Sequence, residues 1–174
     1  EARVERRWPD TLVVSLTEHV PFARWNENAL VDGDGEIFVA AVADRLPRLG
    51  GPDGSSVEVV DAYQRYARTL APLGQRIEEL RLSPRRAWRM RLESGMQLAL
   101  GREQVDARLT RFAELYPRLF GARPAVDGKP QVAVAPEAVD LRYPDGFAIR
   151  MPANRMPASF ASPAPAAPIK PSTT

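Results

Sequence analysis

Residues 139–151 read Val-Asp-Leu-Arg-Tyr-Pro-Asp-Gly-Phe-Ala-Ile-Arg-Met, and the fold is inferred most directly from here. Apolar and polar residues alternate on both sides of Pro144-Asp145-Gly146, which is typical of two antiparallel strands joined by a tight turn. A three-residue loop keeps the apolar side chains of both strands on one face. The predicted pairs in this last β-hairpin are Tyr143 with Phe147, Leu141 with Ile149, and Val139 with Met151.

The second strand of this hairpin, Phe147 to Met151, has no later strand to pair with. Pro152 follows at once, and residues 152–174 are rich in Pro, Ala, Ser and Thr. Such a segment buries too little apolar surface to offset its ordering entropy, so we expect a disordered tail. The domain is therefore expected to end on an open sheet edge unless an earlier strand covers it.

Three further strands are predicted at the centre of the sheet, over residues 77–82, 87–93 and 96–100, because apolar and polar residues alternate in each. Glu93-Ser94-Gly95 forms another three-residue turn with Gly95 in the left-handed region. This turn aligns Leu92 with Met96, Met90 with Leu98, and Trp88 with Leu100.

The sequence pattern also predicts hairpins in the amino-terminal part of the chain. Strands over 2–7 and 11–20 are joined at Trp8-Pro9-Asp10, and a short pair over 29–31 and 36–39 encloses Asp32-Gly33-Asp34-Gly35. This acidic turn does not fit a calcium loop, because Ile37 stands where the loop needs Gly and Ala43 where it needs Glu. We therefore predict a hairpin turn there and no metal site.

Two helices are expected to cover the sheet. The first follows a capping box of Ser55 and Glu58 and stops at Pro72, and the second spans 103–116 and is closed by Pro117. Together with the strands, they indicate an α+β fold: an antiparallel, mostly β domain with two covering helices. The apolar stripes are Val60, Tyr63, Ala67 and Leu70 in the first helix, and Val105, Leu109, Phe112 and Tyr116 in the second.

The composition argues against most catalytic and metal-dependent classes. The 174 residues include no cysteine and one histidine, His19, which we expect on a strand surface or edge. No nucleophile elbow, phosphate-binding loop or dinucleotide fingerprint occurs, so we expect neither an enzyme nor a cofactor. The net charge is only +2 and the arginines are mixed with acids, which disfavours nucleic acid as a partner. Arg85 and Arg86 lie at the start of a predicted strand, where they could bind acidic groups of another protein.

The chain starts with Glu and holds no apolar run near the ~20 residues that span a bilayer. We expect a fragment whose membrane anchor, if it has one, lies upstream.

Several motifs in order along the chain resemble the FtsQ/DivIB family of bacterial cell-division proteins, specifically its FtsQ branch. Each motif alone is weakly specific for the family. The ordered set, which extends to about residue 151, is strong evidence for the resemblance. The motifs are Trp8-Pro-Asp-Thr-Leu, Glu18-His-Val-Pro-Phe-Ala-Arg-Trp-Asn, Leu30-Val-Asp, Leu49-Gly-Gly-Pro-Asp-Gly-Ser, Arg85-Arg-Ala-Trp, Leu100-Gly-Arg, Arg111-Phe-Ala-Glu-Leu-Tyr-Pro and Val139-Asp-Leu-Arg-Tyr-Pro-Asp-Gly-Phe-Ala.

The resemblance implies a protein of the cell inner membrane with one transmembrane helix, and with a POTRA domain and a β domain on the periplasmic side at the division septum. Residues 1–22 would then hold the terminal hairpin of the POTRA domain, 23–151 the β domain, and 152–174 the disordered tail. The transmembrane helix and most of the POTRA domain would be missing from this chain.

The resemblance also implies a non-enzymatic role. In the family the β domain binds the carboxy-terminal segment of FtsB, which is paired with FtsL, by strand addition at its last edge strand, and so helps to recruit and regulate septal peptidoglycan synthesis. Ile149 lies on that predicted edge. Two positions depart from the family: Asp145 can be Ser in relatives, and Met151 stands where a relative has Trp. The family's contact positions fall on Arg85, Arg142, Tyr143, Asp145, Gly146, Phe147 and Met151.

Two other functions stay open at this point. A POTRA-type chaperone for outer-membrane polypeptides would also add strands at an edge. A periplasmic cell-wall hydrolase is disfavoured by the lack of histidine and cysteine clusters.

Overall fold

The computed structural model describes residues 2–8, 10–16, 18–41, 45–120, 123–126, 129–131, 135–144 and 146–152. The predicted disordered tail beyond Pro152 lies outside these residues, as does Asp145. The elements are β1 (Ala2–Arg7), β2 (Thr11–Leu16), β3 (Ala23–Trp25), β4 (Ala29–Val31), β5 (Ile37–Phe38), β6 (Arg48–Gly50), α1 (Ser56–Leu70), a 3-10 turn (Ala71–Leu73), β7 (Ile77–Leu82), β8 (Trp88–Leu92), β9 (Gln97–Gly101), α2 (Val105–Phe120), β10 (Arg123–Val126), β11 (Lys129–Gln131), β12 (Ala138–Asp140) and β13 (Ala148–Arg150).

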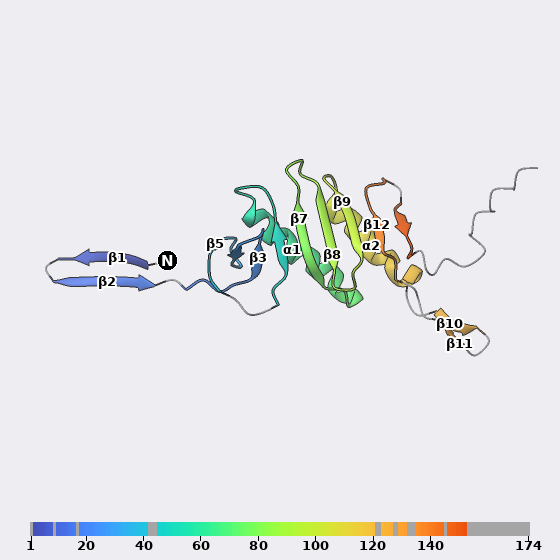
Figure 1. The fold of residues 1–174 in the computed structure, drawn as a ribbon, viewed down its shortest axis with the longest axis horizontal. Helices are drawn as coiled ribbons and strands as arrows, with labels where there is room; N and C mark the ends of the chain where they lie inside the picture. The colour runs from blue at the N-terminus through green and yellow to red at the C-terminus, as the bar shows by residue number, and fades with distance from the viewer. Residues whose placement is uncertain are drawn as a thin grey trace, which may run out of the picture.

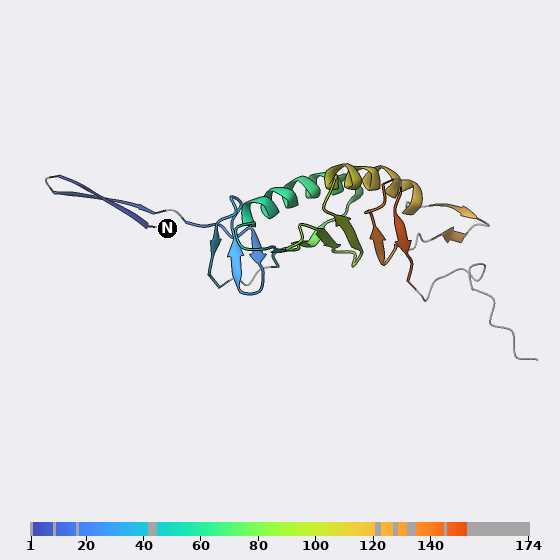
Figure 2. The same ribbon diagram turned by 90° about the horizontal axis from the view of Figure 1, so that it is seen from above.

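Within the described residues, nine strands form one sheet in the order β13-β12-β9-β8-β7-β6-β3-β4-β5. Figure 2 shows α1 and α2 along the same face of this sheet. The α+β class with two covering helices is thus confirmed. Most strand pairs are antiparallel, as predicted, but β3 with β6, β6 with β7, and β9 with β12 are parallel. The β1–β2 hairpin lies apart from the sheet (Figure 1).

The central hairpin confirms most of the predicted register. Met90 pairs with Leu98, the Leu92 amide donates to the Met96 carbonyl, and Gly95 has a φ of 86°. The pairing of Trp88 with Leu100 is wrong, because Trp88 lies opposite Gly101. Gly101 has a φ of 81°, which absorbs the extra residue as a bulge.

The helices are found where they were predicted, but three details differ. Ser55 Oγ donates to the Pro52 carbonyl and makes no cap hydrogen bond, so the capping box is wrong. Tyr66 is fully buried in α1, whereas the predicted Tyr63 is only half-buried. Pro117 lies inside α2, which runs on to Phe120, so Pro117 does not close the helix.

The last hairpin forms, but its predicted register is wrong. Val139 pairs with Ile149 instead of Met151, a shift of two residues that leaves the side-chain faces unchanged. Strand β12 ends early because the Asp140 carboxylate accepts the Arg142 backbone N–H, a local turn that competes with the ladder. The connection between β12 and β13 is therefore longer than three residues.

Candidate protein-interaction edge

Strand β13 is the last strand of the sheet and pairs with β12 alone among the described strands. The Glu137 backbone N–H donates to the Arg150 carbonyl over 2.9 Å, so this carbonyl faces β12. Backbone groups alternate sides along a strand, and the N–H and C=O of one residue in an antiparallel ladder point the same way. The N–H and C=O of Ile149 therefore face outward, away from the sheet.

The side chain of Ile149 ends an apolar row that crosses the helix-covered face. The strand register joins Leu49, Leu80, Met90, Leu98, Val139 and Ile149 in that order. The first five are buried, with Val139 only 1% exposed, whereas Ile149 is 39% exposed. The apolar layer is thus incomplete at this edge, where one more strand would cover Ile149.

Helix α2 holds the loop before β13 in place. The Arg111 guanidinium donates to the Pro144 carbonyl over 2.6 Å, and the Phe147 ring meets Phe112 edge-to-face with centroids 6.0 Å apart. At the start of the loop, Leu141 is buried and its N–H donates to the Ala99 carbonyl. These contacts fix both ends of the loop, so the open edge is presented by a supported strand.

Arg142 has a partner inside the molecule. Its Nε donates to Asp140 Oδ1 over 2.8 Å, and its Nη2 donates to Asp140 Oδ2 over 2.6 Å. The hydrogen bond from Arg142 is the main reason that the pKa of Asp140 is lowered from its usual value, and the same contact raises the pKa of Arg142. A carboxylate from another protein would have to share Arg142 with Asp140.

The other predicted contact residues divide into two groups. Tyr143 is exposed, and Gly146, Phe147 and Met151 are half-buried around the same edge. Arg85 is exposed in the turn between β7 and β8. Strands β8, β9 and β12 separate that turn from β13, on the order of 15 Å at about 4.8 Å per strand. The structure therefore gathers the loop residues with Ile149 and leaves Arg85 apart.

Arg86, next to Arg85, is engaged elsewhere. It has a φ of 62°, and its Nη2 donates to both carboxylate oxygens of Glu58 over 2.5 and 2.6 Å. Both arginines were expected at the start of a strand and only Arg85 at a family contact position; of the two, only Arg85 makes no ion pair with the described residues. Arg111 was not recognised as a support of the loop, because its contact with Pro144 joins residues 33 positions apart.

At the opposite end of the sheet, His19 packs beside the turn between β4 and β5. His19 lies beyond the end of β2, so the predicted strand position is wrong, and its ring stacks on Phe38 with centroids 5.1 Å apart. Its Nδ1 lies 2.9 Å from Asp32 Oδ2, and Asp32 Oδ1 accepts the backbone N–H groups of Asp34 and Glu36. The hydrogen bond with His19 lowers the pKa of Asp32 from its usual value, although burial opposes this shift.

His19, Asp32 and Glu36 bring three possible ligand atoms within 4.8 Å of one another. The Asp32 carboxylate already has three hydrogen-bond partners, two backbone N–H groups of the turn and the His19 ring, which gives this group a structural role.

Comparison with known proteins gives one consistent result. A family model described as the C-terminal domain of the cell division protein FtsQ/DivIB matches residues 23–142. Cell division protein FtsQ of Burkholderia pseudomallei is 42% identical over 152 residues, which cover 86% of this chain and 59% of that protein. FtsQ of Nitrosospira multiformis is 40% identical over 149 residues, with coverages of 86% and 59%. FtsQ of Escherichia coli is 38% identical over 154 residues, with coverages of 86% and 53%.

The chain thus spans between about half and three-fifths of the length of these relatives. Strand β13 lies just beyond the residues that the family model matches. Neither described helix has the length and apolar character that crossing a bilayer requires. The names of the relatives concern cell division and do not favour an outer-membrane chaperone.

Proposed function

Because this chain belongs to the FtsQ/DivIB family of cell-division proteins, we propose that it is a non-enzymatic scaffold whose β13 edge binds a partner strand. The proposed partner is the carboxy-terminal segment of FtsB, paired with FtsL. The proposed setting is the periplasmic side of the inner membrane at the division septum. There the scaffold would help to recruit and regulate septal peptidoglycan synthesis.

The outward N–H and C=O of Ile149 carry this proposal. Unpaired backbone groups on a sheet edge form hydrogen bonds with an added strand, and alternate side chains of that strand supply specificity. An apolar side chain beside Ile149 would continue the buried row that now ends there. A partner strand with apolar residues on one face therefore fits this edge best.

Side chains around the edge would add specificity. Tyr143 is 54% exposed and lies in the loop that leads to β13. Arg142 would take a partner carboxylate in addition to Asp140, and Arg85 would reach a part of the partner that extends beyond the added strand. Phe147 supports the edge from inside, because it packs on Phe112.

The test is the affinity of the Ile149→Pro variant for an FtsB carboxy-terminal peptide. Proline removes the outward N–H, and edge strands tolerate it where that N–H faces solvent. We expect the variant to stay folded and to bind at least about tenfold more weakly, since one lost hydrogen bond and the misfit ring together exceed 1.4 kcal/mol.

Ile149→Ala is the matched control, because it trims the side chain and keeps the N–H. We expect a smaller loss of affinity for this variant. Wild-type affinity in a folded Ile149→Pro variant contradicts strand addition. Amide exchange gives a second readout, because the Ile149 N–H should become protected only when the peptide is present.

A further inference from the structure

The face of the sheet opposite α1 and α2 carries a row of arginines. Residues between the buried ones in each strand project to this face, which no described helix covers (Figure 2). The arginines of the central strands that lie there are exposed or half-exposed. We call the set the arginine track: Arg24 on β3, Arg48 on β6, Arg81 on β7, Arg89 and Arg91 on β8, and Arg150 on β13.

The strand register places like charges side by side in the track. Arg24 lies opposite Arg48, and Arg81 lies opposite Arg89. Like charges directly opposite one another destabilise a sheet. Arg81 already pairs with Glu79, so the other members of these pairs, Arg48 and Arg89, favour an anionic group beside them.

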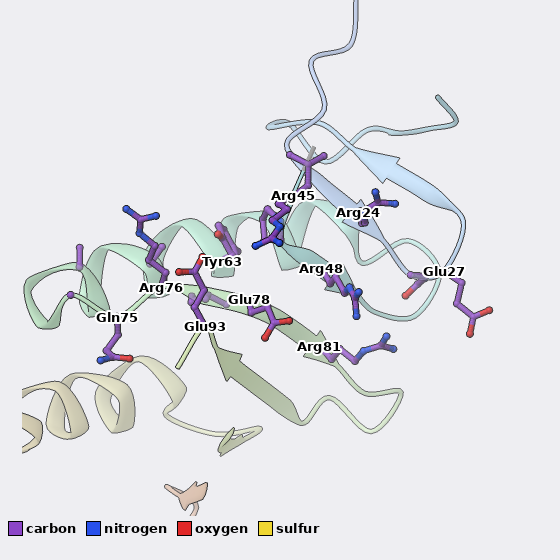
Figure 3. Close-up of a pocket in the computed structure, with 17 residues that line it drawn as sticks. Arg24, Glu27, Arg45, Arg48, Tyr63, Gln75, Arg76, Glu78, Arg81 and Glu93 are labelled. Atoms are coloured by element: carbon purple, nitrogen blue, oxygen red, sulfur yellow. The ribbon is translucent and has the colours of Figure 1, made fainter. Parts of the chain in front are cut away.

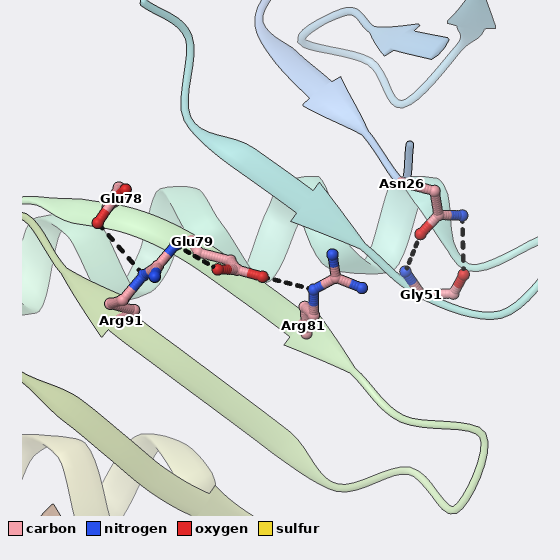
Figure 4. Close-up of polar contacts among 6 residues, drawn as sticks. All are labelled: Asn26, Gly51, Glu78, Glu79, Arg81 and Arg91. Atoms are coloured by element: carbon pink, nitrogen blue, oxygen red, sulfur yellow. Dashed lines mark hydrogen bonds and ion pairs between the residues drawn. The ribbon is translucent and has the colours of Figure 1, made fainter. Parts of the chain in front are cut away.

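Three acids lie within the track and neutralise part of it: Glu78 and Glu79 beside Arg91, and Asp140, which pairs with Arg142. Glu79 accepts from Arg81 Nε and from Arg91 Nη2, and Glu78 lies 3.2 Å from Arg91 Nε (Figure 4). Arg48 and Arg89, on either side of this network, form no ion pair with the described residues. These two guanidinium groups, and that of Arg150, are available to an external carboxylate.

A hollow reaches from this face around the ends of the strands to helix α1. Arg24, Arg48 and Arg81 come from three adjacent strands and line this open hollow of about 1420 Å³ (Figure 3). Tyr63 and Ala67 of α1 contribute to its lining. A second hollow of about 480 Å³ lies over Ala99, Ala138 and Ala148, with Arg89 and Arg150 in its lining.

We propose that the arginine track is a second docking surface, which binds an acidic segment of a partner protein. Guanidinium groups match carboxylates with two parallel hydrogen bonds, so Arg48 and Arg89 would each take an Asp or Glu side chain. The two hollows leave room for the segment between these contacts. The surface does not include the outward backbone groups of β13. This proposal can therefore be tested independently of the proposed function.

A polypeptide fits this surface better than an anionic membrane does. Interfacial binding needs apolar side chains that enter the bilayer. None of the large apolar side chains that are exposed in the described residues lies on β6, β7, β8 or β9. A hollowed surface also makes poor contact with a flat bilayer, whereas an extended segment can follow it.

The experiment measures binding of a short, fluorescently labelled poly-glutamate peptide to the full 174-residue chain at two salt concentrations. We expect Arg48→Gln with Arg89→Gln to weaken binding at least about tenfold, since two charge-assisted contacts are lost. The matched control is Arg68→Gln with Arg118→Gln, which removes the same charge from exposed positions on the helices. We expect less than about a twofold effect from the control.

Equal losses in the two double variants would overturn the proposal, because they would show attraction by net charge alone. Unchanged binding in the Arg48/Arg89 variant would also overturn it. Binding to phosphatidylglycerol vesicles that depends on the same two arginines would overturn the proposed partner, because it would identify an anionic membrane as the ligand. Each single substitution is measured as well, so a folding defect in one variant leaves the test intact. Ile149→Pro should bind the peptide like the wild type, which separates this surface from the β13 edge.

Discussion

The β8–β9 and β12–β13 hairpins have similar patterns of apolar and polar residues but differ in strand register. Both alternate apolar and polar residues around a short turn that contains Gly. In β8–β9 the register follows the turn, so Met90 pairs with Leu98 as the pattern predicts. In β12–β13 the register is shifted by two residues, and Val139 pairs with Ile149.

Burial explains the difference. Both strands of β8–β9 lie under the helices, so every apolar pair contributes to choosing the register. In the other hairpin only Val139 of β12 is buried, and all three residues of β13 are exposed. The Asp140 turn and the packing of Phe147 on Phe112 then decide where β13 pairs. A strand whose own side chains do little to fix it can offer its backbone to a partner.

The largest expected effect comes from truncating the apolar row at its centre. Leu98→Ala leaves a cavity among buried side chains and should lower the free energy of unfolding by about 3 kcal/mol. Ile149→Ala, in the same row at the edge, should lower it by less than about 1 kcal/mol, because Ile149 is 39% exposed. Urea denaturation of both variants measures the two values. Equal losses of unfolding free energy in the two variants would contradict the inference that the centre of the row is packed and its edge is not.

A smaller effect is expected from the contact that holds the edge. Phe147→Ala loses half-buried area and the edge-to-face contact with Phe112, so the free energy of unfolding should fall by about 1–2 kcal/mol. Tyr143→Ala is the control, since Tyr143 is 54% exposed, and it should change stability by less than about 0.5 kcal/mol. The same denaturation experiment applies. A Phe147 variant as stable as the Tyr143 variant would show that α2 does not hold β13.

The smallest effect concerns Asp32 and His19, at the opposite end of the sheet. The pKa of Asp32 in the folded protein lies below its usual value, mainly through the hydrogen bond with His19. The ionised carboxylate therefore stabilises the fold above that usual pKa, and the contribution is lost as the pH falls through the lowered pKa. We expect the stability advantage of the wild type over Asp32→Asn, about 1 kcal/mol or less, to shrink between about pH 5 and pH 2.

Thermal melts across this pH range measure that advantage. His19→Ala removes the main cause of the pKa shift, so it should reduce the same pH dependence. A difference between wild type and Asp32→Asn that stays constant with pH would contradict the assignment.

Local patterns were sufficient where a residue's neighbours in sequence are also its determining neighbours in space. The turn at Gly95, the two helices and the existence of a final edge strand follow from alternation, helical spacing and Gly or Pro positions. The capping box failed although its spacing was right, because Glu58 pairs with Arg86 from another turn. Pro117 was assigned as a helix end, yet α2 continues through it.

The candidate site was only partly predictable for the same reason. The sequence identified the edge strand and, through its family motifs, the loop residues around it. It did not identify the support from Arg111 and Phe112, which depends on contacts between distant segments. Nor did it identify the arginine track, since parallel pairing of β3, β6 and β7 brings Arg24, Arg48 and Arg81 together.

The amino-acid sequence by itself therefore determined the fold class, the last edge strand among the described residues and the family. Periodicity and turn chemistry depend on residues that are close in the sequence, so they can be recognised without knowing the tertiary structure. Only the tertiary structure decided which backbone groups of β13 face outward. That choice depends on a register set by the local turn at Asp140 and by the packing of Phe147 on Phe112 of helix α2. The second contact joins distant segments, so no local pattern encodes it.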